Sequence, residues 1–174
     1  MIILRPLERS DLLTLRPWRN NRKLRNQTHG FRFPVSDDME QIWFEKNVLE
    51  APPHKAIFAI QHEDNSLAGL AQLDGIDLVH RNARLGIFIG AETARGKGLG
   101  KKALIELIDF GFADLNLVKI YLYVNISNTN AIRLYEQTGF VTEGTLKSHY
   151  FVNNSWEDLL IMSIFQENWQ PLQD

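Results

Sequence analysis

Hydrophobic residues that recur every three or four positions predict several helices along this chain. The first helix is expected to begin near Ser10 or Asp11 and the second directly after Ser36, because short polar side chains cap helix starts. A third helix has an apolar face formed by Leu99, Ala103, Leu104, Leu107, Ile108 and Gly111. The fourth begins after Asn128 and stops at Gly139, which suits a left-handed C-terminal turn.

The remaining hydrophobic runs have the pattern of strands. They cover residues 56–60, 67–73, 83–89, 119–124, 142–152 and 155–165. We expect the first three to pair antiparallel and the last two to meet at a turn formed by Asn153 and Asn154. The strand 83–89, the third helix and the strand 119–124 form a βαβ unit, which requires two parallel strands. The pattern therefore predicts an α/β fold built on a mixed sheet.

Composition narrows the class of protein. The 174 residues, 44% of them hydrophobic, fit one globular domain spanning 1–174. A formal net charge of -2 gives no general attraction for nucleic acid or an anionic membrane, so any anion site must be local. The chain has no cysteine and no metal-ligand spacing among its five histidines, so we expect no metal site. We expect the cytoplasm as its compartment. We expect Arg19, Arg22 and Arg25 to form a solvated helix face, with contact to a ligand as the alternative.

Residues 95–100, which link the strand 83–89 to the third helix, form a basic, glycine-spaced loop. Positive φ angles are open to its glycines, Gly96, Gly98 and Gly100. Formal positive charge comes from Arg95, Lys97, Lys101 and Lys102. Main-chain N–H groups at a helix N-terminus suit a phosphate or pyrophosphate, although a glycine-rich turn with solvated lysines has the same sequence. The loop lacks the Walker lysine followed by Ser or Thr, which favours a phosphate-bearing ligand without an obligatory metal.

Two motifs, taken in order on the expected elements, identify a family. Arg95, Gly98 and Gly100 match the pattern of Arg or Gln, two residues, Gly, one residue, and Gly or Ala. The second signature is matched by Asn128, Ala131, Tyr135, Gly139 and Phe140. Over essentially its whole length the chain resembles the GNAT superfamily of acyl-CoA-dependent N-acetyltransferases. It is most similar to the branch of ribosomal-protein N-terminal, spermidine and amino-sugar acetyltransferases. The resemblance implies a mixed sheet whose two central parallel strands splay apart.

The resemblance also implies how acetyl-CoA binds as a co-substrate, with no metal. The pantetheine arm is expected between the splayed strands, where its amides pair with the backbone near Phe88, Ile89 and Gly90. The pyrophosphate is expected in the loop formed by Arg95, Gly96, Lys97, Gly98, Leu99, Gly100 and Lys101. Asn128 is expected to bond the cofactor arm, a role that is compatible with capping the fourth helix.

Acetyl transfer to an amine sets its own requirements. An alkyl amine with a pKa of about 10 must lose a proton before it attacks, and the departing thiolate benefits from a proton donor. By resemblance that donor is Tyr135, which could instead be a core aromatic. The absence of cysteine favours direct attack in a ternary complex. Many relatives carry a glutamate where this chain has Arg84, so the base is unassigned, with Asp74, Asp77 and His80 as candidates.

A second departure concerns the acceptor. Spermidine enzymes of this branch carry an acidic pair before the proline that follows the first helices, whereas Arg32 and Phe33 precede Pro34 here. Because an arginine repels a polycation, we expect a peptide or ribosomal-protein N-terminus or an amino sugar, with a polyamine as the alternative. A competing class is a CoA-binding sensor or interaction module without activity. Exposed strand edges in the closing hairpin are compatible with a homodimer or a higher homo-oligomer.

Overall fold

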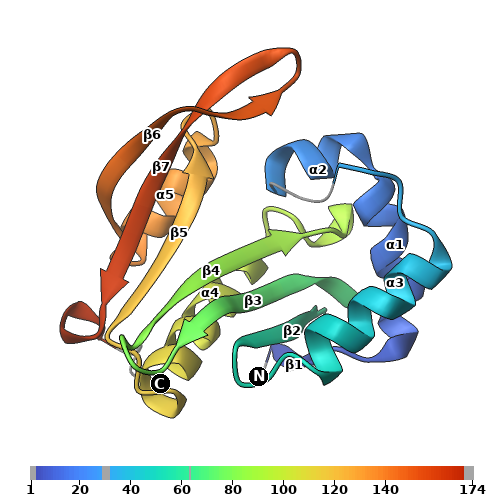
Figure 1. Ribbon diagram of the computed structural model, residues 1–174, viewed down its shortest axis with the longest axis horizontal. Helices are drawn as coiled ribbons and strands as arrows, with labels where there is room; N and C mark the ends of the chain where they lie inside the picture. The colour runs from blue at the N-terminus through green and yellow to red at the C-terminus, as the bar shows by residue number, and fades with distance from the viewer. Residues whose placement is uncertain (1–2, 29–31, 63, 171–174) are drawn as a thin grey trace.

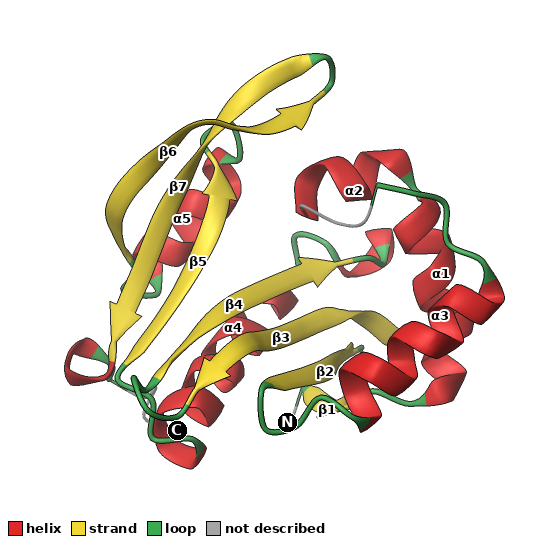
Figure 2. Cartoon of the chain, in the orientation of Figure 1, coloured by secondary structure: helices red, strands yellow, loops and turns green. Residues whose placement is uncertain are grey.

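The computed structural model describes residues 3–28, 32–62 and 64–170, and its strands form one mixed sheet (Figure 2). The strands are β1 Leu4–Pro6, β2 Lys55–Gln61, β3 Leu67–Asp77, β4 Asn82–Ile89, β5 Lys119–Asn125, β6 Val141–Val152 and β7 Ser155–Phe165. Their order in the sheet is β1-β2-β3-β4-β5-β7-β6. β4 and β5 are parallel and every other neighbouring pair is antiparallel, which confirms the expected mixed sheet.

Helices cover both faces of this sheet (Figure 1). Their bounds are α1 Leu12–Asn20, α2 Arg22–Thr28, α3 Asp37–Phe44, α4 Leu99–Asp109 and α5 Thr129–Gln137. One apolar core joins the sheet to α4 and α5, where Leu104, Leu107 and Ile108 are fully buried. A smaller core joins the sheet to α1 and α3 through Leu15 and Phe44. None of the described helices is both long and apolar enough to cross a bilayer.

The helix starts follow the capping rule with one exception. The Ser36 hydroxyl accepts a hydrogen bond from Met39 N–H (3.2 Å), and the Asn128 side chain accepts one from Ala131 N–H (3.3 Å), as expected. Asp11 is the N-cap residue of α1, as expected, but its side chain makes no cap hydrogen bond. Its carboxylate instead accepts from Glu8 N–H and pairs with Arg5, because a 3-10 turn over Arg9–Asp11 precedes the α-helix.

The central parallel strands are paired over only a short length. Their register runs from Asn82↔Lys119 to Arg84↔Tyr121 and then ends. β4 continues along β3 and β5 continues along β7, so the two halves of the sheet part in a V (Figure 1). From Leu85 onward, the edge of β4 that faces β5 has no strand partner among the described residues. The splayed strands that the resemblance implied are therefore present.

The expected solvated arginine face is wrong at Arg19. Its side chain is only 19% exposed, its Nε lies 3.1 Å from an oxygen of buried Glu40, and its guanidinium stacks 3.7 Å above the Trp43 ring. α1 packs against α3, so this arginine lies between the helices. Arg22 is exposed as expected, whereas Arg25 is half-buried.

Candidate active site

The glycine loop before α4 presents a group of backbone donors. Gly96 and Gly98 have φ angles of 73° and 77°, in the left-handed region that glycine adopts without strain. Gly98 is the N-cap of α4, and the N–H groups of residues 96–100 have no hydrogen-bond acceptor in the described part of the chain. Gly100 does not share the left-handed geometry, because it already lies in the first turn of the helix. The loop is a helix N-terminus with unused donors, the arrangement that suits phosphate.

Charged side chains around the loop point in different directions. The exposed lysines beside the donors are Lys97, Lys101 and Lys102. Arg95 turns back toward β4, where its Nε donates to the carbonyl of Ile89 (3.3 Å) and its Nη2 to that of Gly90 (3.4 Å). Of the three residues expected at the pantetheine arm, Phe88 and Ile89 line the gap between the strands, whereas Gly90 lies just after β4 and its N–H donates to the carbonyl of Ala68 (2.9 Å). Among the described contacts of the basic residues expected around the loop, those of Arg95 alone include hydrogen bonds to the backbone at the end of β4.

The parted strands enclose a cavity of about 310 Å³. Phe88 and Ile89 line it from β4, and Tyr123 and Asn125 line it from β5. It reaches α2 on one face of the sheet at Leu24, and α5 on the other face at Asn128 and Tyr135. Ile89 also adjoins the start of α4, since a Cβ placed on Gly100 would lie 3.7 Å from Ile89 Cγ1. A passage through the sheet thus begins beside the donor loop, and these residues fit a long, phosphate-bearing ligand.

Tyr135 is positioned by α5 at the inner end of this passage. Its side chain is 8% exposed, and its ring lies 5.6 Å from that of Phe140, centroid to centroid. Burial raises the pKa of the Tyr135 hydroxyl to about 12, because water no longer solvates the phenolate. The hydroxyl is therefore protonated at neutral pH, which is the form that a proton donor requires.

A second cavity of about 620 Å³ lies between β3 and β4 and the helices α1 to α3. Trp18 packs edge-on against Phe88 there, with ring centroids 6.2 Å apart. The close approach of Trp18 requires glycine at position 90, where an added Cβ would lie 2.2 Å from the indole ring. This cavity, which we call the groove, shares Arg84, Gly86 and Phe88 with the passage through the sheet. Two molecules could therefore meet where the two cavities join.

The structure separates the candidate bases. Asp74 lines the groove, where it pairs with Arg84 and with Lys55 Nζ at 3.0 Å. Burial by itself would raise the pKa of Asp74, but the hydrogen bonds from Lys55 and Arg84 outweigh it and hold that pKa below its ordinary value. A carboxylate with a lowered pKa and two cationic partners is a weak base, so this geometry does not suit the role.

Asp77, the last residue of β3, and His80, in the turn between β3 and β4, lie outside these cavities. The Asp77 carboxylate accepts from the N–H groups of Val79 (2.9 Å) and His80 (2.8 Å) and contacts His80 Nδ1 at 2.8 Å. These contacts close the turn, so a structural role accounts for both the aspartate at position 77 and the histidine at position 80. Neither residue lines the passage or the groove.

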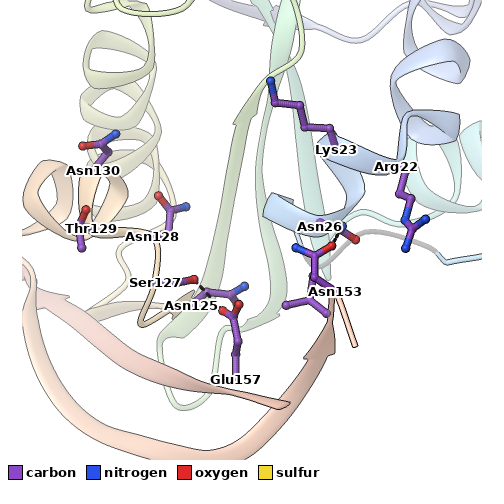
Figure 3. Close-up of a pocket in the computed structure, with 11 residues that line it drawn as sticks. Arg22, Lys23, Asn26, Asn125, Ser127, Asn128, Thr129, Asn130, Asn153 and Glu157 are labelled. Atoms are coloured by element: carbon purple, nitrogen blue, oxygen red, sulfur yellow. Dashed lines mark hydrogen bonds between the residues drawn. The ribbon is translucent and has the colours of Figure 1, made fainter. Parts of the chain in front are cut away.

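A third cavity, of about 670 Å³, opens beside the carboxyl end of β5. Figure 3 places Ser127 and Glu157 on one side of it and Asn26 of α2 on the other. Ser127 Oγ donates to Glu157 (2.7 Å), and Asn26 Nδ2 donates to Asn153 Oδ1 (2.8 Å), so α2 is tied to the tip of the β6–β7 hairpin. Asn125, 7% exposed, lines both this cavity and the passage.

Sequence reasoning missed Asn125 and Glu157. Asn125 had a usable signal, because it is the last residue of a strand that precedes the Asn128 motif, and ligands bind at the carboxyl ends of parallel strands. Glu157 had none, since only the long hairpin returns it to the end of β5. Among the described residues, no group of three or more His, Asp or Glu side chains could hold a metal ion.

The fold and the site together define an acyl-CoA-dependent acyltransferase. A donor loop at a helix N-terminus lies beside a gap in the sheet that is lined by a protonated tyrosine, and a second cavity opens on the other face.

Comparisons with known proteins give the family. The family model described as an acetyltransferase (GNAT) domain matches residues 1–141. The chain is 33% identical over 168 residues to a spermidine N(1)-acetyltransferase of Vibrio cholerae, covering 97% of this chain and 95% of the relative. It is 34% identical over 167 residues to the spermidine N(1)-acetyltransferase of Escherichia coli K12, covering 95% and 87%. The chain therefore belongs to the GNAT acetyltransferase family.

Solved structures agree with this placement. The crystal structure of spermidine N-acetyltransferase from Vibrio cholerae in complex with CoA and spermine has a TM-score of 0.88 to this chain, with 33% identity and 95% of each chain covered. The resemblance predicted from the sequence, the fold and the use of acetyl-CoA are thereby confirmed, and the protein is an acetyl-CoA-dependent N-acetyltransferase. The comparisons favour the polyamine alternative over the peptide or amino-sugar acceptor that the sequence analysis placed first.

Proposed function

We propose that this enzyme acetylates a primary alkyl amine by direct attack on acetyl-CoA in a ternary complex, with Tyr135 as the general acid. The observation that carries the proposal is the passage between β4 and β5, which is lined by Tyr135, meets the groove, and lies beside the donor loop at Ile89. We further propose that residues 1–174 form a single domain, since strands from both ends of the described chain belong to one sheet.

The residues around the passage have separate roles in this proposal. The N–H groups of residues 96–100 and the lysines beside them hold the pyrophosphate, while Phe88, Ile89 and Asn128 line the channel for the pantetheine arm. When acetyl-CoA is bound, it supplies a thioester. The neutral amine attacks the carbonyl carbon, the C–S bond breaks, and the leaving sulfur takes the proton of Tyr135. The nitrogen then loses a proton, which restores the tyrosine.

A donor for the developing oxyanion is available at the edge of β4. Past Arg84 this edge faces β5 without a strand partner among the described residues, so a backbone N–H of residues 85–89 can serve. The proton on the incoming ammonium leaves to solvent water in this proposal. Asp74 is excluded from the role of base by its two cationic partners, and Asp77 and His80 by their place in the turn.

A polyamine is the first acceptor to test, because the relatives that cover nearly the whole chain are spermidine acetyltransferases. The second candidate is an amine that carries an acidic group, which the charge of the groove supports. The test is a mass-shift screen of spermidine, putrescine, amino sugars and peptide N-termini with acetyl-CoA, together with thiol release. A gain of one acetyl group on a primary amine supports the proposal, and saturable CoA binding without transfer to any amine contradicts it.

A further inference from the structure

Positive charge gathers around the groove. Four cationic side chains line it, Arg19, Arg25, Lys55 and Arg84, against the single carboxylate of Asp74. Buried Glu40, which is paired with Arg19, adds one more carboxylate behind the wall. The four cations against two carboxylates leave an excess of two positive charges in a cavity whose other walls are largely aromatic and aliphatic. Local charge here is therefore opposite in sign to the chain as a whole, whose formal net charge is -2.

Arg84 supplies much of the unbalanced charge. It stands opposite Asp74 in the β3–β4 ladder and pairs with it, but Lys55 pairs with the same carboxylate from β2. One carboxylate cannot neutralise two cations. The Arg84 side chain is 45% exposed and lines both the groove and the passage, so part of its guanidinium can reach a molecule bound there.

Arg25 supplies the rest of the unbalanced positive charge in the groove. Its Nη1 donates to the carbonyl of Arg32 (2.7 Å), and it forms no ion pair with a carboxylate among the described residues. Its Nε is buried and has no hydrogen-bond partner there. That nitrogen is out of reach of a ligand, but none of the described contacts uses Nη2, which is not among the buried atoms and can donate to an anion in the groove. Arg19 differs, because Glu40 and the Trp43 ring already occupy its guanidinium.

From these contacts we infer that Arg25, Lys55 and Arg84 form an anion subsite in the groove, which binds an acidic group of the acceptor while its amine enters the passage. The acceptor is accordingly an amine that also carries a phosphate or carboxylate. Arginine suits this role because its planar fork binds both groups with two hydrogen bonds. The inference rests on the proposed acetyl transfer and narrows its acceptor class.

The connection between the cavities makes this arrangement geometrically possible. Arg84, Gly86 and Phe88 line both the groove and the passage, so a small molecule can occupy the groove and reach the thioester position. The same charges work against a polyamine. A polycation would bring several ammonium groups next to an excess of positive charge, which disfavours binding. This chain would then differ in acceptor from the spermidine enzymes that it resembles.

Matched pairs of acceptors test the subsite. We compare butylamine with 4-aminobutyrate, which adds a carboxylate, and glucosamine with glucosamine 6-phosphate, which adds a phosphate, with spermidine alongside. The expected result is a kcat/KM higher by about 10- to 100-fold for at least one acidic member over its neutral partner, the range typical of hydrogen bonds between charged groups. The pair that shows the gain identifies which acid the subsite takes.

Substitutions test which residues cause the preference for an acidic acceptor. Arg84→Gln and Arg25→Gln should each lower the ratio of kcat/KM for the acidic member to kcat/KM for its neutral partner by about 10-fold or more. Arg9→Gln is the matched control, since Arg9 pairs with Glu45 on the surface and lines neither cavity. It should keep the full preference. Circular dichroism and thermal unfolding check that each variant is folded.

Binding without chemistry separates this inference from the proposed function. Calorimetry of the CoA-saturated enzyme should detect glucose 6-phosphate or butyrate, neither of which has an amine, and should detect no glucose. Binding that Arg84→Gln weakens supports the subsite even if no acceptor has been found. If spermidine is acetylated best, and neither acid binds nor raises kcat/KM, the subsite is refuted and the acetyl-transfer proposal stands. Absence of transfer to every amine refutes that proposal instead.

Discussion

Tyr135→Phe is the substitution that most sharply separates chemistry from structure in this enzyme. It removes one hydroxyl from a side chain that is 8% exposed and leaves the aromatic ring in place. The ring contact with Phe140, at 5.6 Å, is kept. The described contacts include no hydrogen bond from the hydroxyl to another part of the protein, so little packing or hydrogen-bond energy is lost on folding. We therefore expect a change in unfolding free energy of less than about 1 kcal/mol.

The effect on catalysis should be much larger. A positioned general acid contributes about 10²- to 10⁴-fold, so kcat should fall by about that factor, or roughly 3 to 5 kcal/mol in the barrier. The dissociation constant for CoA should stay within about twofold. The assays are thiol release at saturating substrates, calorimetry with CoA, and thermal unfolding. Equal losses in kcat and CoA affinity, or an unchanged kcat, would show that Tyr135 has a structural role.

The wild-type pH profile provides an independent check on the same residue. Burial raises the pKa of Tyr135 to about 12, so the acid form persists well above neutral pH. Activity should therefore rise with pH as the acceptor amine loses its proton, with no decline due to Tyr135 below about pH 11. A decline near pH 10 that disappears in Tyr135→Phe would mean that this hydroxyl is not buried as described.

Three further substitutions test other parts of the account. Gly98→Ala places a side chain at φ 77°, where the added Cβ meets no atom within 4 Å, so its effect should come from backbone strain of about 1 to 2 kcal/mol and weaken CoA binding by about 5- to 30-fold in calorimetry. Asn128→Ala loses the cap of α5 and should lower the unfolding free energy by about 1 kcal/mol in denaturant titrations. Asp11→Asn tests an ion pair: burial alone would raise the pKa of Asp11, but hydrogen bonds from Arg5 and Glu8 hold it below its ordinary value. Its contribution is therefore complete above the unfolded pKa of about 3.9 and is lost as pH falls through the folded value, so wild type and variant should differ in Tm at pH 6 and converge near pH 2.

Local patterns in the sequence were sufficient to predict most of the elements. Polar residues at helix starts marked Ser36 and Asn128 correctly, and Gly139 has a φ of 101°, as a left-handed stop requires. Asn153 and Asn154 have φ angles of 50° and 63°, which fit the tight turn expected between the last two strands. These features depend on neighbours in the chain. Asp11 is the N-cap residue of α1 as expected, but the helical pattern does not reveal the preceding 3-10 turn or the pairing with Arg5, which occupy its carboxylate.

Tertiary contacts determine the environment of the residues that the sequence pattern did not predict correctly. Arg19 was expected in solvent, but packing of α1 on α3 put it between Glu40 and Trp43. Asp74 was a candidate base until the sheet register brought Lys55 and Arg84 beside it. Because these contacts join distant parts of the chain, no local pattern could have revealed them. Residues 29–31, which directly precede Arg32 and Phe33, lie outside the described part of the structure.

The claim on which the account depends is that the loop of residues 95–101 and the gap between β4 and β5 hold acetyl-CoA. The most direct measurement is a crystal structure of the enzyme grown with CoA. The account predicts the pyrophosphate against the N–H groups of residues 96–100 and the pantetheine arm between the strands, with its sulfur near Tyr135. CoA seated elsewhere, with the gap between β4 and β5 empty of it, would contradict the account.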